Sequence, residues 1–125
     1  MLEAYSLNVT VPANTSIPFN NTSIRKGCTA ELNGVSTIEL NKCGVYMIAC
    51  DTSAAAATTI QLFKDGIAQP QAQSTGTSPS FVTLVQVDKN NSCCPCSSPT
   101  TLEVYNADET AGTYNSVNVV VTKII

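Results

Sequence analysis

The chain has 125 residues, of which 12% are charged, and a formal net charge of −3. This length suits one domain with its own core. Six Lys and Arg residues, scattered apart from Arg25-Lys26, exclude the cationic cluster that nucleic acid or an anionic membrane surface requires. No apolar stretch approaches the roughly 20 residues that cross a bilayer. We therefore expect no nucleic-acid partner and no membrane insertion.

Strand signals recur along the chain, whereas helix signals are nearly absent. Alternating or continuous apolar runs bounded by turn residues predict strands at 7–11, 35–40 (preceded by 30–34), 45–50, 58–64, 67–73, 81–87, 100–105 and 116–125. Turns spaced about 8 to 12 residues apart predict an all-β sandwich or barrel. The order of elements favours a compact jelly roll of about eight to ten antiparallel strands, formed by residues 1–125 as a single domain. Residues 1–14 are either an N-terminal strand or a connecting arm.

One hairpin is predicted from its turn residues. Asp65-Gly66 follows the strand 58–64 and favours a two-residue turn that pairs it with the strand 67–73. Pro70 cannot donate a hydrogen bond to a neighbouring strand, so the second strand is expected at a sheet edge or with a bulge.

Two strands are apolar on both faces. Residues 45–50 are continuously apolar, and residues 117–125 are apolar apart from Asn118, Thr122 and Lys123. An antiparallel strand with one wet face should instead alternate. One face can pack on the partner sheet, and the other requires a second cover, which a subunit interface would supply. The alternative is that these are central strands covered by loops.

The order of three motifs resembles a known superfamily. Gly44-Val45-Tyr46-Met47-Ile48-Ala49-Cys50 is followed by Ile60–Ile67, which contains Asp65-Gly66, and then by Phe81-Val82-Thr83-Leu84. Over roughly residues 15–125 this order is similar to the compact jelly roll of the tumour necrosis factor and complement-type globular-head superfamily. Bacterial and phage proteins of this kind include spore-surface glycoprotein heads and virion fibre or decoration proteins.

The resemblance implies a homotrimer whose outer loops or crevices bind a ligand, and it implies no catalysis. The last family strand, residues 118–125 here, would lie near the trimer centre. On this basis we place four residues at the trimer axis: Tyr46, Ile48, Val119 and Val121.

Six cysteines are the most distinctive feature of the composition: Cys28, Cys43, Cys50, Cys93, Cys94 and Cys96. Cys28 and Cys43 flank one predicted strand pair and form a candidate disulfide. Cys50 lies in an apolar run and is expected to be a buried thiol. The other three are close enough to share a soft metal such as zinc, but their spacing is unusual and no histidine is present. Disulfides within or between subunits, unpaired thiols and a metal site stay open for them.

Candidate catalytic groups are sparse. The absence of histidine removes the commonest general base. Asp108-Glu109 is the densest carboxylate pair, but adjacent loop carboxylates are typical of a solvated turn. The sequence contains neither a Gly-rich phosphate loop nor a nucleophile elbow, and its carboxylates are too few to define a calcium site. We expect no catalytic residues and no cofactor.

These features predict a non-enzymatic, trimeric virion or surface module of bacterial or phage origin. It would decorate a capsid or form a head fibre, and it would contact a host surface glycan or protein. The alternative is a purely structural protein that cements a capsid or spore surface without a host ligand. The first residues lack a secretory signal. If Met1 is the natural start, the protein would be made in the host cytosol and carried on the virion surface, with a spore or cell surface as the alternative.

Host attachment is predicted to use two polar loops that contain glycine, 74–80 and 107–115, because rigid scaffolds expose variable contacts on loops. The named residues are Ser74, Thr75, Thr77, Asp108, Thr110 and Thr113.

Overall fold

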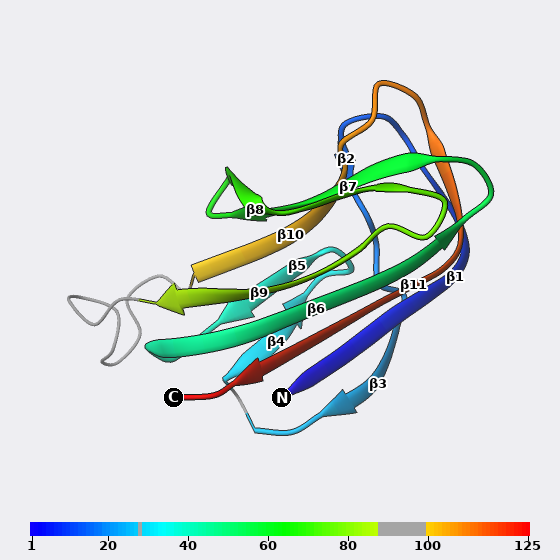
Figure 1. Cartoon of the computed structure of the whole chain (residues 1–125). Coiled ribbons are helices and arrows are strands. Elements are labelled where there is room, and N and C mark those ends of the chain that lie inside the picture. The colour runs from blue at the N-terminus through cyan, green and yellow to red at the C-terminus, as the bar shows by residue number, and fades with distance from the viewer. Residues whose placement is uncertain (28, 88–99) are drawn as a thin grey trace.

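The computed structural model describes residues 1–27, 29–87 and 100–125, which form two antiparallel sheets packed face to face (Figure 1). Sheet A has the strand order β3 (Asn21–Arg25), β1 (Leu2–Val11), β11 (Gly112–Lys123), β6 (Gly44–Ala54) and β9 (Ser80–Val87). Sheet B has the order β4 (Ala30–Asn33), β5 (Thr37–Leu40), β10 (Thr100–Asn106), β7 (Thr58–Lys64) and β8 (Ile67–Gly76), and β2 (Thr15–Ser16) pairs with β10. The predicted all-β jelly roll is confirmed. Within these ranges, no helix is long and apolar enough to cross a membrane.

The core lies between the two sheets and is filled by every second residue of the long strands. In β9, for example, Phe81, Thr83, Val85 and Val87 face inward. The largest fully buried side chains come from both sheets and from the segment between β2 and β3: Tyr46, Tyr114, Phe19, Leu2, Ile17, Ile38, Leu40, Ile48, Ile60, Leu62 and Leu102.

The predicted hairpin is confirmed. β7 and β8 pair through a turn in which Asp65 and Gly66 have φ values of 51° and 80°, the left-handed conformation that Asp-Gly tolerates. β8 lies at the edge of sheet B, and its pairing with β7 shifts register between Gln61 and Phe63. Pro70 is therefore found where the missing amide hydrogen is tolerated.

Several strands begin or end where the sequence predicted otherwise. β2 and β3 were not predicted, because their residues are polar and β3 is exposed along its whole length. β8 continues through Gly76 and β11 begins at Gly112, so parts of both predicted ligand loops are strand. Edge and end segments of this kind obtain their strand conformation from pairing with a neighbour, and they carry little hydrophobic periodicity of their own.

The glycine in Gly44-Val45-Tyr46 is required by close packing at the start of β6. A Cβ at Gly44 would collide with the backbone carbonyl oxygen of Ile125, and the backbone φ of 142° is one that glycine adopts readily. Tyr46 is fully buried, and its hydroxyl donates to the Lys42 carbonyl at 2.7 Å. The tyrosine hydroxyl thus fixes the turn before β6, and the start of β6 is tied to the end of the chain by the Ile124 amide, which donates to the Val45 carbonyl at 2.8 Å.

Candidate functional site

The outward side of sheet A carries an apolar surface. On β6 the buried residues Tyr46, Ile48 and Cys50 alternate with Val45, Met47 and Ala49, which are partly exposed. The same alternation leaves Val82 and Leu84 of β9 68% and 57% exposed. Because successive side chains of a strand point to opposite faces, the partly exposed set lies on the outside of the sheet.

Strand pairing joins these residues into two rows across sheet A. Ala49 pairs with Val82 on one side and with Val120 on the other. Met47 pairs with Leu84 and with Thr122. Residues directly opposite one another on neighbouring strands have their Cβ atoms about 5 Å apart. The rows therefore form one continuous patch, which we call the apolar outer face: Val45, Met47, Ala49, Val82, Leu84 and Val120.

A polar row borders the apolar outer face on the side away from the termini. Asn118, Asp51 and Ser80 are aligned across β11, β6 and β9. Along β1, Glu3 pairs with Val120, and its carboxylate accepts hydrogen bonds from Ser23 Oγ at 2.7 Å and from Asn118 Nδ2 at 3.3 Å. The surface thus has an apolar centre bordered by polar groups along one row and beside β1, an arrangement common in protein interfaces.

The residues predicted for the trimer axis face the other way. Tyr46, Ile48, Val119 and Val121 are each 0% exposed within the single chain, so their side chains belong to the core. Their place at a trimer axis stays a prediction. The outward positions on these strands are the residues that alternate with the predicted ones, with Val120 lying between Val119 and Val121.

The two predicted ligand loops lie close together at the end of the sandwich opposite the termini (Figure 1). Ala54 N donates to the Thr77 carbonyl at 2.7 Å, and Ala55 N donates to the Thr113 carbonyl at 2.9 Å. Thr75, Thr77, Thr110 and Thr113 are exposed, whereas Ser74 and Asp108 are partly exposed. The structure therefore places all six predicted contact residues at or near one end, and their role in binding stays a prediction.

A buried asparagine positions one of these loops. Asn106 is 0% exposed, and its Nδ2 donates to the carbonyls of Val11 and Thr110, each at 3.1 Å. Its Oδ1 accepts from Thr58 Oγ1 at 3.1 Å and from the Asp108 amide at 3.2 Å. A buried amide is stable only when its donors and acceptors are paired. Asn106 therefore fixes the loop after β10 against the end of β1.

Of the cysteines, Cys43 and Cys50 lie in the described part of the chain. Cys43 is disulfide-bonded, and its predicted partner Cys28 lies outside the described residues, so that pairing stays a prediction. Cys50 is a free, buried thiol, as expected. Burial raises its pKa to about 12, and the charge of Asp51 adds to the effect, so it remains a neutral thiol at ordinary pH.

The predicted soft-metal segment, Cys93, Cys94 and Cys96, also lies outside the described residues. In the described ranges, no three His, Cys, Asp or Glu side chains converge to hold a metal ion. Asp108 and Glu109 occur in a turn, where the Glu109 amide donates to Asp108 Oδ1 at 2.7 Å. That contact fits the solvated-turn interpretation of the pair.

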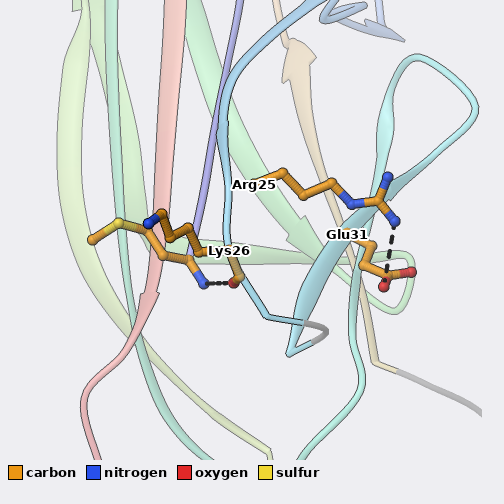
Figure 2. Close-up of polar contacts among 4 residues, drawn as sticks. Arg25, Lys26 and Glu31 are labelled. Carbon is orange, nitrogen blue, oxygen red and sulfur yellow. Dashed lines mark hydrogen bonds and ion pairs between the residues drawn. The ribbon is translucent and has the colours of Figure 1, made fainter.

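Arg25 and the amino group of Met1 each make a polar contact with a neighbouring segment. Arg25 of sheet A reaches Glu31 of sheet B at 3.6 Å, and the amino group of Met1 donates to the Lys26 carbonyl at 2.9 Å (Figure 2). The Arg25 side chain is 63% exposed, so the ion pair adds well under about 1 kcal/mol to stability.

No family model matches the sequence, and no curated protein matches it. Solved structures match along nearly the whole chain. The vertex protein P5 of PRD1 aligns with a TM-score of 0.67 and 14% identity, covering 99% of this chain and 96% of that one. The globular domain of zebrafish complement 1qA aligns with a TM-score of 0.73 and 10% identity, again covering 99% and 96%. Rabbit GITRL aligns with a TM-score of 0.58 and 13% identity, covering 100% and 95%.

The chain has the fold of the tumour necrosis factor and complement 1q jelly-roll heads. The resemblance inferred from the sequence is therefore confirmed at the level of fold. Identities of 10 to 14% do not carry over a ligand or a partner. Among the described residues, the apolar outer face of sheet A is a surface on which exposed apolar side chains gather, with Val82 and Leu84 68% and 57% exposed.

Proposed function

We propose that the protein is a non-enzymatic, homotrimeric surface module whose subunits meet through the apolar outer face of sheet A. The observation that carries the proposal is the exposure of Val82 and Leu84 beside Met47, Ala49 and Val120. Burying apolar surface stabilises an assembly by about 25 cal/mol for each Å² removed from water. A second and a third copy of the chain would cover the apolar outer face with apolar surfaces of their own. None of the six residues of that face is charged, so no charged group among them would be buried.

The virion surface is the proposed location. The likeness in fold to a vertex protein of PRD1 supports this, since that protein is named for its place on a shell. The likeness to complement and GITRL heads supports a role in recognition. A capsid or fibre protein would hold the module, and a host surface glycan or protein would be its ligand.

The second candidate is a structural module that caps or cements a shell without a host ligand. The polar rim of the apolar outer face and the well-packed end loops suit either role. The two differ in one property that can be measured directly: whether the purified protein is retained by host cells as well as by capsids.

Light scattering of the purified protein, with and without reductant, tests the assembly. The expected mass is about 39 kDa, three times the chain mass of 13.1 kDa. A mass of 13.1 kDa would contradict the proposal. Loss of the higher mass only after reduction would assign the association to cysteines instead of the apolar outer face, and would contradict it as well.

A further inference from the structure

The outward side of sheet B carries an aromatic pair surrounded by hydrogen-bonding groups. Phe63 of β7 and Tyr105 of β10 have ring centroids 4.2 Å apart and planes tilted by 35°. Their strands are paired so that Phe63 lies opposite Glu103, and Tyr105 lies opposite Gln61. Both rings are partly exposed, on the face directed away from the core residues Leu62 and Val104.

Amide, hydroxyl and carboxylate groups flank the two rings. Gln61 also pairs with Gln73 of β8, and Tyr105 also pairs with Ser16 of β2. Glu103 Oε2 accepts a 3.4 Å hydrogen bond from Thr37 of β5. The rings and these residues form a strip across sheet B, which we call the aromatic strip: Phe63, Tyr105, Gln61, Gln73, Glu103 and Ser16.

Much of the hydrogen-bonding capacity of the aromatic strip is unused. Among the described residues, neither the Tyr105 hydroxyl nor the Gln73 amide has a side-chain hydrogen bond. The Gln61 amide nitrogen donates to the Gln69 carbonyl at 3.2 Å, which leaves its oxygen as an acceptor. A carboxylate has about four acceptor positions, so Glu103 retains several beyond the one that Thr37 occupies.

This combination matches the chemistry of a sugar ring. The C–H face of a pyranose packs on aromatic rings, and its hydroxyls both donate and accept hydrogen bonds. Amides and carboxylates at the border of a ring pair complement that pattern, whereas a protein-binding patch would be more apolar at its centre. We propose that the aromatic strip binds an uncharged pyranose unit of a surface glycan.

The local charge selects against anionic sugars. Glu103 lies within the strip, and Glu39 follows on the neighbouring strand β5, opposite Thr101. Lys64, which follows Phe63 in β7, donates to the Gln86 carbonyl of sheet A at 2.9 Å, and Arg25 pairs with Glu31. Sialylated, sulfated and phosphorylated glycans would therefore be repelled. This inference deepens the proposed function, because it assigns a ligand class and places the ligand on sheet B instead of in the two end loops.

The test is binding of the native protein to an immobilised panel of neutral oligosaccharides built from glucose, galactose, mannose and N-acetylglucosamine, printed beside sialylated and sulfated versions. We expect binding to at least one neutral glycan and none to its charged counterparts. Tyr105→Leu, which keeps an apolar contact with Phe63 but removes the flat ring, should weaken binding about tenfold. Gln73→Ala should weaken it about threefold.

Gln86→Ala is the matched control, because it removes the same amide from an exposed position on sheet A. It should bind like the native protein. Light scattering and thermal unfolding of each variant separate a lost contact from a lost fold or a lost trimer. Absence of neutral-glycan binding, preference for charged glycans, or equal binding by the folded Tyr105→Leu and Gln73→Ala variants would overturn the inference. A trimer that binds no glycan would overturn this inference alone, and a monomer that binds glycan would overturn the proposed assembly alone.

Discussion

The two sheets present opposite kinds of surface to solvent although they share one architecture. The outward residues of sheet A include Met47, Val82 and Leu84, whereas those of sheet B are chiefly Gln, Thr, Glu and an aromatic pair. Both sheets obey the same alternation, and both bury their inner faces in the same core. The comparison teaches that the fold fixes which positions point outward, and that the residues at those positions decide whether a sheet presents an apolar or a polar surface.

The largest effect is expected from a charge placed on the apolar outer face. Leu84→Lys should convert the trimer into a monomer, because an unpaired ammonium group buried in an interface costs several kcal/mol. The isolated subunit should keep its stability within about 0.5 kcal/mol, since Leu84 is 57% exposed there. Light scattering and urea unfolding measure the two effects.

Thr75→Lys places the same charge on an exposed position of sheet B and serves as the matched control. Its mass should equal that of the native protein. If Leu84→Lys remains trimeric while folded, the apolar outer face is not the interface.

The next largest effect is expected where the two sheets are joined at the end opposite the termini. Asn106→Ala removes the side chain that pairs with Val11 of sheet A, Thr58 of sheet B and the loop at Thr110. Leaving these buried groups unpaired should lower the free energy of unfolding by about 2 to 4 kcal/mol. Asn33→Ala removes an exposed amide and should cost under about 0.5 kcal/mol. Equal losses in urea unfolding would contradict this role for Asn106.

The free energy of unfolding should depend on pH through Cys50, which lies on the inner face of sheet A. Cys50 keeps its proton in the folded state up to about pH 12, whereas in the unfolded chain it ionises from roughly pH 8.5. The pKa of Cys50 is higher in the folded state than in the unfolded chain. Its contribution to the free energy of unfolding is therefore complete below the unfolded pKa and is lost as the pH rises. The slope attributable to this group is about 1.4 kcal/mol per pH unit.

Urea unfolding at pH 7 and at pH 10 checks this dependence, with Cys50→Ala as the comparison. Burial also raises the pKa values of Tyr46 and Tyr114, which add a loss of the same sign at still higher pH. The native protein should lose more stability than Cys50→Ala between the two pH values. An equal loss would show that the Cys50 pKa is not raised.

The smallest effect is expected from the aromatic pair of sheet B. Phe63→Ala should lower the free energy of unfolding by about 1 kcal/mol, the range of a partly exposed cross-strand pair. The mass should not change, because sheet B is predicted to face solvent. A fall in mass on light scattering would show that sheet B also lies in an interface, and would remove the contrast between the two sheets.

Much of the fold could be predicted from local patterns. The Asp65-Gly66 turn, the edge position of the strand with Pro70 and the buried thiol of Cys50 each follow from the chemistry of one or two residues. The polar strands β2 and β3 could not be predicted, because only their partners β10 and β1 hold them in place.

The residues predicted for the trimer axis show what local patterns leave open. In a strand that is apolar at every position, such as residues 45–50, alternation defines two faces but does not say which one is inside. The choice is made by Tyr46, whose ring fills the core while its hydroxyl reaches the Lys42 carbonyl. Val45 and Met47 are then directed outward.

By itself, the sequence determined the all-β class and the double apolarity of β6 and β11. The tertiary structure alone decided which of their side chains point outward, and it brought Phe63 beside Tyr105 across 42 positions of chain. The physical reason is the same in both cases. A period of two fixes alternation within a strand, but only pairing between strands and packing between sheets fix the face and the neighbours.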